Sequence, residues 1–170
     1  MNTGQSLLGI GALFLLSLTV LRVNNSILST ETVMQGSKFG VLATSLATSL
    51  IEKACNKAFD ANTDGNPVSS LSQLTGVGGL GPGNGEFPPE KCNDFDDFNG
   101  YTTTVTNLPS AVFNVSCEVC YVNPTTPNIK ANTPTWHKKM TVTVTSPNMG
   151  NEYQRDTIRL STIYSYWTFR

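Results

Sequence analysis

Two groups of acidic and amide side chains have the spacing of oxygen ligands for a metal ion. Asp60, Asn62 and Asp64 alternate ahead of a glycine, as in the first half of a calcium-binding loop. Leu71 stands where such a loop carries its bidentate glutamate, so a second group would have to complete the site. The pattern is compatible with a calcium site formed by Asp60, Asn62, Asp64, Asp94, Asp96 and Asp97. The alternative is a pair of solvated turns closed by Asx hydrogen bonds.

Four cysteines, an even number, favour disulfides in an oxidising compartment over a zinc site. Cys117 and Cys120 have the spacing of a redox pair, but they fall in a predicted strand rather than at a helix N-terminus that would lower the thiol pKa. Residues three apart in a strand point to opposite faces, so each cysteine needs a distant partner. We predict the disulfides Cys55–Cys117, between the apolar faces of helix and strand, and Cys92–Cys120, on the outer face.

Catalytic groups are scarce in this sequence. His137 is the only histidine and precedes two lysines, so a Cys-His or Ser-His arrangement would depend on one unsupported side chain. The glycines at 76–81 match a dinucleotide fingerprint, but Pro82 and Gly83 replace the helix that this fingerprint requires. A net charge of -1 and a charged fraction of 14% provide no basic surface for nucleic acid. We therefore expect a protein that is not an enzyme, whose one candidate cofactor is calcium, and that does not bind nucleic acid.

An uncharged apolar segment begins the chain. No charged side chain occurs before Arg22, and residues 7–21 are almost entirely apolar. This stretch has about the length that spans roughly 30 Å of hydrocarbon. A secretory signal would need a positively charged start and a small-residue cleavage site after the apolar run, and the sequence shows neither. The sequence therefore predicts a retained membrane helix, with a cleavable signal as the alternative.

The helical pattern continues beyond the apolar segment. From Phe39 to Ala58, apolar residues recur at three- and four-residue steps, and no proline occurs before Pro67. A helix over 1–58 would be roughly 80 Å long, far more than the thickness of a bilayer. We predict this helix as the first domain, with Gly36 and Gly40 as its weak points. Its C-terminal half must pack on something other than lipid.

The remainder of the chain, 59–170, is predicted to be one globular head. Residues 59–100 are rich in Gly, Asn, Asp and Pro and indicate a long loop. Residues 101–170 alternate apolar and polar side chains, which predicts an antiparallel sheet with a turn at 146–151 and an irregularity near Ser161. The apolar face of this sheet needs a cover, and the striped half of the helix is the available partner. The predicted fold class is α+β.

A membrane-length apolar helix that continues into an amphipathic one, then a long loop and a C-terminal antiparallel sheet, resembles the type IV pilin and pseudopilin superfamily. The resemblance is architectural and covers the whole chain. In that family the fifth mature residue is usually a glutamate that neutralises the N-terminal amine of a neighbouring subunit, whereas this chain has Gln5. If instead Met1 to Gly4 is a leader peptide, Gln5 is the mature N-terminus and Gly9 occupies the fifth position.

The resemblance implies a structural subunit of an extracellular filament at the cell surface. Such a subunit is anchored in the inner membrane before assembly and is polymerised by pilus assembly machinery, with copies of itself as partners. The residues expected in the filament core are Gln5, Leu7, Leu8, Ile10, Leu13, Phe14, Leu15, Leu16, Leu18, Val20 and Leu21. A minor or secretion-type pseudopilin is a near variant. The alternative from another class is a single-pass membrane protein with an extracytoplasmic binding domain that never polymerises.

Overall fold

The computed structural model describes residues 3–108, 111–151 and 154–166. By its internal contacts the chain divides into two compact units, Met1–Lys38 and Phe39–Arg170. The long helix α1, Thr3–Cys55, supplies the described part of the first unit and continues as the first element of the second.

The first unit consists of the N-terminal part of α1. No proline interrupts it, and the helix is continuous through Gly36 and Gly40, where the sequence had suggested that it could break. In the described chain α1 is the helix that is long and apolar enough to cross a membrane, and none of its apolar window is buried. The sequence therefore predicted the helix correctly, although α1 ends at Cys55 and not at Ala58.

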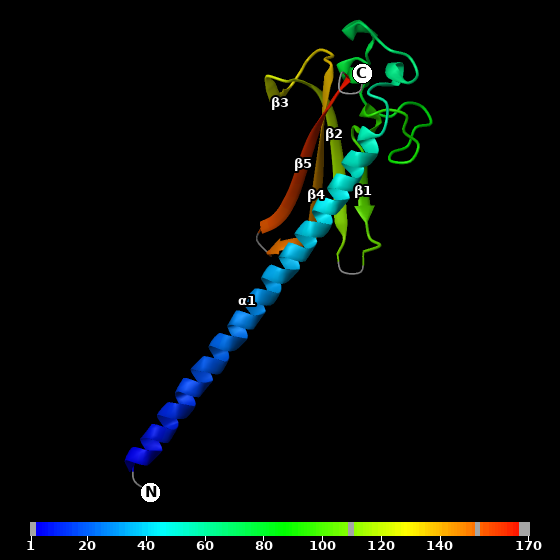
Figure 1. Cartoon of the computed structure of the whole chain (residues 1–170). Helices are drawn as coiled ribbons and strands as arrows, with labels where there is room; N and C mark the ends of the chain where they lie inside the picture. The colour runs from blue at the N-terminus through cyan, green and yellow to red at the C-terminus, as the bar shows by residue number, and fades with distance from the viewer. Residues whose placement is uncertain (1–2, 109–110, 152–153, 167–170) are drawn as a thin grey trace. The chain divides into compact units, whose positions relative to one another are not determined.

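The second unit contains an antiparallel sheet in the strand order β1-β2-β4-β5, with β3 paired to one end of β2 (Figure 1). Alternating side chains along β2 are buried and exposed, as expected for a sheet with one covered face. The strands are β1 Thr102–Val105, β2 Phe113–Asn123, β3 Thr126–Lys130, β4 His137–Asn151 and β5 Gln154–Ser165.

Two local predictions for the sheet were wrong. Residues 146–151, predicted as a turn, form the end of β4. The pairing of β4 with β5 is regular from His137 opposite Ser165 to Thr145 opposite Thr157, so the strand has no irregularity near Ser161. The register shifts instead between Thr145 and Gly150. The predicted strand residues Trp167 and Phe169 lie outside the described residues.

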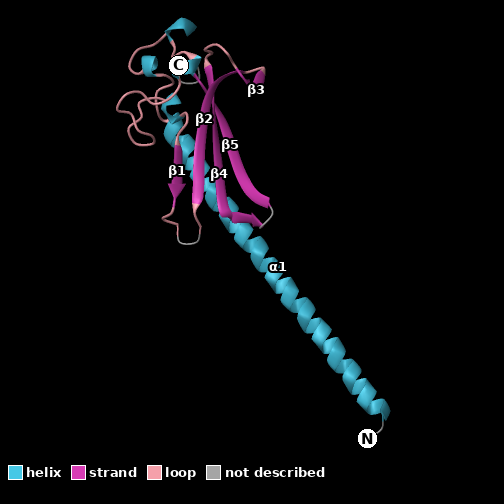
Figure 2. Cartoon of the chain, turned by 180° about the vertical axis from the view of Figure 1, so that it is seen from behind, coloured by secondary structure: helices cyan, strands magenta, loops and turns pink. Residues whose placement is uncertain are grey.

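The main core of the second unit lies between residues 39–55 of α1 and the covered face of the sheet (Figure 2). Small side chains on this helix face, Ala43, Ala47 and Ala54, are fully buried. Phe39 and Leu50 extend the same stripe. The facing residues of β2 and β4 are Phe113, Val115, Cys117, Val119, Met140, Val142 and Val144. The structure thus confirms the α+β class and the helix as the cover of the sheet.

Residues 56–101 connect the helix to the sheet and contain only short 3₁₀ helices, as the Gly- and Asn-rich composition predicted. These are η1 Ala61–Thr63, η2 Leu71–Gln73, η3 Val77–Gly79 and η4 Asp96–Phe98. The segment is tied together by a parallel bridge between Ala58 and Asp94, with Phe95 N donating to Ala58 O at 2.8 Å. A second core cluster contains Phe59, Val68 and Leu74 of this segment and Tyr121 of β2.

Candidate assembly helix and buried charge cluster

The first candidate site is the apolar surface of α1 in the first unit. Every apolar residue that the sequence analysis assigned to a filament core is exposed, from 42% for Leu18 to 77% for Leu8, and Gln5 is exposed among them. Exposed apolar surface of this extent marks a site of contact with lipid or with another protein. Within the described chain, no part of the protein covers these side chains.

This apolar surface extends well past Leu21. The exposed large apolar side chains beyond it in the first unit are Val23, Ile27, Leu28, Val33 and Met34. Two hydroxyl groups on this surface are hydrogen-bonded to the helix backbone. Thr30 Oγ1 donates to Ser26 O at 2.9 Å, and Thr32 Oγ1 donates to Ser29 O at 2.8 Å. Hydroxyls bonded to their own helix backbone need no water, so they are compatible with an apolar environment.

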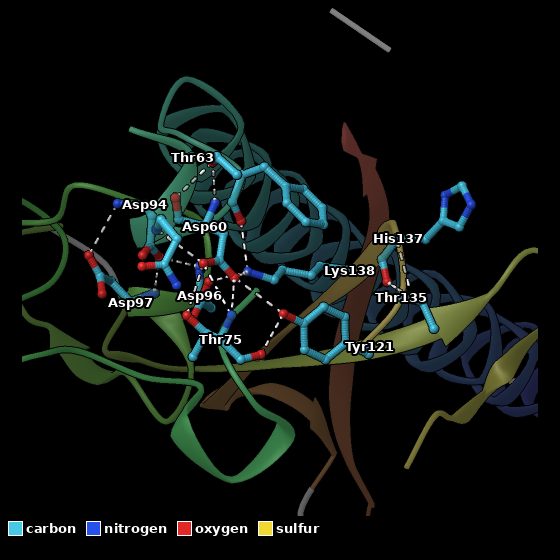
Figure 3. Close-up of polar contacts among 12 residues, drawn as sticks. Asp60, Thr63, Thr75, Asp94, Asp96, Asp97, Tyr121, Thr135, His137 and Lys138 are labelled. Carbon is cyan, nitrogen blue, oxygen red and sulfur yellow. Dashed lines mark hydrogen bonds and ion pairs between the residues drawn. The ribbon is translucent and has the colours of Figure 1, made fainter. Parts of the chain in front are cut away.

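The second candidate site is a buried charge cluster in the second unit, defined here as Lys138, Asp60, Asp94, Asp96 and Asp97 (Figure 3). Lys138 lies on the covered face of β4, two residues before Met140, and its side chain is fully buried. Its ammonium donates to Phe59 O at 2.8 Å, to Asp60 Oδ2 at 2.8 Å and to Asp96 Oδ1. All three Nζ donors therefore have an acceptor, which a buried ammonium requires.

Asp60 is held as an ionised carboxylate. It caps η1 by accepting from Asn62 N at 3.1 Å. Thr75 donates to it through both N, at 3.0 Å, and Oγ1, at 2.9 Å, and Tyr121 donates its hydroxyl at 3.2 Å. Burial by itself would raise the pKa of Asp60, but the charge of Lys138 and these hydrogen bonds hold the pKa below its usual value.

Asp94 is in the opposite state. Burial, together with the negative charges of Asp96 and Asp97, raises the pKa of Asp94 to about 8, so its carboxyl is protonated at neutral pH. Its Oδ1 accepts from Asp96 N at 2.8 Å and from Asp97 N at 3.1 Å, and its side chain also shares a hydrogen bond with the Asp96 side chain. Burial raises the pKa of Asp96 as well, against the opposing charge of Lys138.

These contacts replace the predicted calcium site. In the part of the chain that the structure describes, no group of three or more His, Cys, Asp or Glu side chains could hold a metal ion. Asp60 and Asp96 do converge, but on the ammonium of Lys138, which occupies the place of a cation. Asn62 and Asp64 point into solvent as exposed residues. In the sequence Lys138 was noted only as one of two lysines after His137, so its burial was not expected. It alternates with the buried Met140, Val142 and Val144, and this alternation was the signal that could have predicted an inward side chain.

The predicted disulfides are not formed, and all four cysteines are free thiols. Cys117 faces the main core, as predicted, and Cys55 packs against that core from the helix. Cys92 also lies in the main core, whereas Cys120 is on the outer face of β2 beside Glu118, so the sheet separates the second predicted pair. Burial raises the pKa of Cys92 to about 11 and that of Cys117 to about 12, which suppresses their reactivity as thiolates.

His137, the one histidine of the sequence, lies half-buried at the start of β4. Its Nδ1 contacts Ser165 Oγ at 2.7 Å, across the register of β4 and β5, and its carbonyl accepts from Thr135 Oγ1 at 2.9 Å. The ring contact is therefore a cross-strand hydrogen bond at the end of the sheet.

No family model matches the chain, and neither a curated protein nor a solved structure shows significant similarity to it. The fold itself is the remaining guide to relationship. A long apolar N-terminal helix whose C-terminal part packs on an antiparallel sheet is the arrangement described above. This architecture is consistent with a pilin-like fold.

Proposed function

We propose that the chain is a structural subunit of an extracellular, type IV pilus-like filament, and that it polymerises through the apolar surface of residues 3–38. The observation that carries this proposal is the exposure of that surface. Its large apolar side chains are 42–77% exposed, and no part of the described chain covers them. Before assembly the same surface would anchor the subunit in the inner membrane, from which the pilus assembly machinery would extract it.

The length of the apolar surface favours a filament over a simple membrane anchor. Residues 3–38 of a helix extend for about 54 Å, whereas the hydrocarbon of a bilayer is roughly 30 Å thick. A single-pass anchor would therefore leave one end of the surface in water, for example the end with Ile27 and Met34. Parallel packing against the same helix of neighbouring copies would cover the whole length.

A charge placed in the apolar surface tests the proposal. Leu13→Asp and Leu16→Lys each put an unpaired charge where helices are expected to pack, and we expect either change to abolish filaments. Asn132→Asp is the matched control for Leu13→Asp, because it adds the same negative charge at an exposed position of the second unit. Pelleting and negative-stain electron microscopy of the full chain measure assembly. Normal filaments from Leu13→Asp or Leu16→Lys would contradict the proposal, and a wild type that stays monomeric would support the anchored alternative.

A further inference from the structure

The centre of the buried charge cluster brings an amine and carboxyl groups together away from solvent. Lys138 and Asp60 have fully buried side chains, that of Asp96 is 3% exposed, and Asp94 is buried beside them. Two aromatic rings enclose the ammonium, since Nζ lies 4.6 Å from the centroid of Phe59 and 5.2 Å from that of Tyr121. Figure 3 shows Asp60 and Asp96 pointing toward the end of the Lys138 side chain.

Such a site favours amide formation between the two side chains. In water an ammonium and a carboxylate stay ionised because both are hydrated, but burial removes that hydration and makes the charged pair costly. An amide carries no charge, so its formation relieves this cost. The fold also holds the two groups in contact, which replaces a bimolecular encounter by an effectively unimolecular step.

The two flanking carboxyl groups have complementary proton states. Asp60 accepts hydrogen bonds from Asn62, Thr75 and Tyr121, and this keeps it an anion in contact with the Lys138 ammonium. It is therefore placed as a base. Asp94 Oδ1 accepts from Asp96 N at 2.8 Å, and burial raises the pKa of Asp94 to about 8, so a protonated carboxyl lies beside Asp96 and is placed as an acid. Asp96, between this acid and the amine, is the carboxyl group poised to accept the nitrogen.

We propose that Lys138 Nζ and Asp96 Cγ form an intramolecular isopeptide bond, with Asp60 as the base and Asp94 as the acid. Asp60 takes one proton from the ammonium, and the neutral amine attacks Asp96 Cγ while Asp94 protonates an Asp96 oxygen. The C–O bond then breaks as the nitrogen returns a proton to Asp94 and Asp60 gives its proton to the leaving hydroxyl. One ammonium and one carboxylate become one amide and one water molecule, and both flanking residues regain their starting states.

The bond would join β4 to η4 and close the chain between residues 96 and 138. This link would fasten the segment 56–101 to the sheet. The regular elements of that segment are short 3₁₀ helices. The inference does not depend on the proposed filament, because the reaction needs only the folded second unit of the same chain. In a filament under tension, however, the link would keep that segment from being pulled away from the sheet.

The intact mass of the purified full chain tests this inference directly. After reduction and alkylation of the four cysteines, we expect a mass lower by one water than that calculated for the alkylated sequence, and a peptide map in which Lys138 is joined to Asp96. A full-length mass without loss of water after prolonged incubation at neutral pH would overturn the proposal. A bond from Lys138 to Asp60 would overturn the assignment of the roles.

Two variants separate the chemistry from the fold. Lys138→Arg keeps a buried cation but supplies no amine, and we expect it to have the unmodified mass. Asp94→Asn keeps the shape and the acceptor oxygen of Asp94 but removes the acid, and we expect the bond to form at least about 100-fold more slowly. Asp64→Asn is the matched control on the exposed part of the same connecting segment and should react at the rate of the wild type. An Asp94→Asn variant that reacts as fast as Asp64→Asn would contradict the role of Asp94.

Discussion

The two units of the chain differ in which side chains they leave exposed. In the first unit Leu13 and Leu16 are 66% and 60% exposed, whereas Leu50, on the part of α1 that belongs to the second unit, is 8% exposed. All three are leucines of one continuous helix, so helix propensity does not distinguish them. What differs is the partner, because the second half of the helix has its own sheet and the first half has no partner in the described chain.

The second unit also buries charged side chains, which the first unit leaves exposed. Arg22, Glu31 and Lys38 of the first unit are exposed, whereas Lys138 of the second unit is buried and pairs with Asp60 and Asp96. A buried charge is tolerated only where partners surround it, and the second unit supplies them from its connecting segment. The second unit thus buries its apolar and charged clusters within itself, while the first has an apolar surface that no part of the described chain covers.

Loss of the buried ammonium should have the largest effect on stability. Lys138→Met removes the nitrogen on which Asp60 and Asp96 converge, so both carboxylates are buried without it, whether that nitrogen is an ammonium or the proposed amide, and we expect the free energy of unfolding to fall by about 3–5 kcal/mol. Lys139→Met is the control from the other face of β4. Lys139 Nζ bonds to Pro127 O and Asn128 Oδ1, and its loss should cost only about 0.5–1.5 kcal/mol. Urea unfolding of the full chain in detergent measures the free energy of unfolding of both variants. Equal losses from Lys138→Met and Lys139→Met would contradict the inferred importance of the cluster.

Truncation of leucines along α1 compares the two units directly. Leu50→Ala should lower the free energy of unfolding of the second unit by about 2–5 kcal/mol, because it leaves a cavity against the sheet. Leu16→Ala removes the same atoms from an exposed position and should leave the urea unfolding midpoint of the unassembled subunit unchanged. A comparable loss from Leu16→Ala would show that the first unit has a partner within the chain, contrary to this account.

The smallest effect concerns pH. Burial raises the pKa of Asp94 to about 8, well above its ordinary value of 3.8, so the folded state keeps a proton that the unfolded state has released. The stability associated with Asp94 is therefore complete below pH 3.8 and is lost as the pH rises through about 8. For one proton the slope is at most about 1.4 kcal/mol per pH unit. Asp94→Asn should flatten the fall in melting temperature between pH 5 and 9.

Asp60 should act in the opposite direction at low pH. Its pKa in the folded state is lowered, so its contribution to stability is present above the ordinary value of 3.8 and is lost as the pH falls below it. Melting curves of the wild type from pH 2 to pH 9 should consequently show a maximum in the mildly acidic range. A melting temperature that rises steadily to pH 9 would contradict the assigned proton state of Asp94.

Much of the fold followed from periodicity in the sequence. The three- and four-residue steps between Phe39 and Ala54 identified the buried face of α1, and the alternation along residues 113–121 identified β2 and the inward direction of Cys117. Both patterns succeed because they report burial of a local surface against one partner. The predicted turn at 146–151 failed because Pro147 and Gly150, which usually interrupt strands, lie where β4 continues past a register shift.

The buried charge cluster was only half predictable. The acidic residues of the connecting segment were recognised as ligands of a cation, but the cation was assigned to calcium rather than to Lys138. The partners of Lys138 lie 78 and 42 residues away in the sequence, and no local pattern reports contacts at that separation. The Cys92–Cys120 prediction failed for a similar reason, because the path of the connecting segment decides the face on which Cys92 lies.

Cryo-electron microscopy of the assembled wild-type protein tests the central claim most directly, because it shows what covers residues 3–38. The account predicts a helical filament in which the apolar side chains of these residues, Leu13 and Leu16 among them, are buried between parallel helices of neighbouring copies. Separate particles in a lipid or detergent belt would contradict it. So would a filament whose contacts involve only residues 39–166 and leave the N-terminal helix surface uncovered.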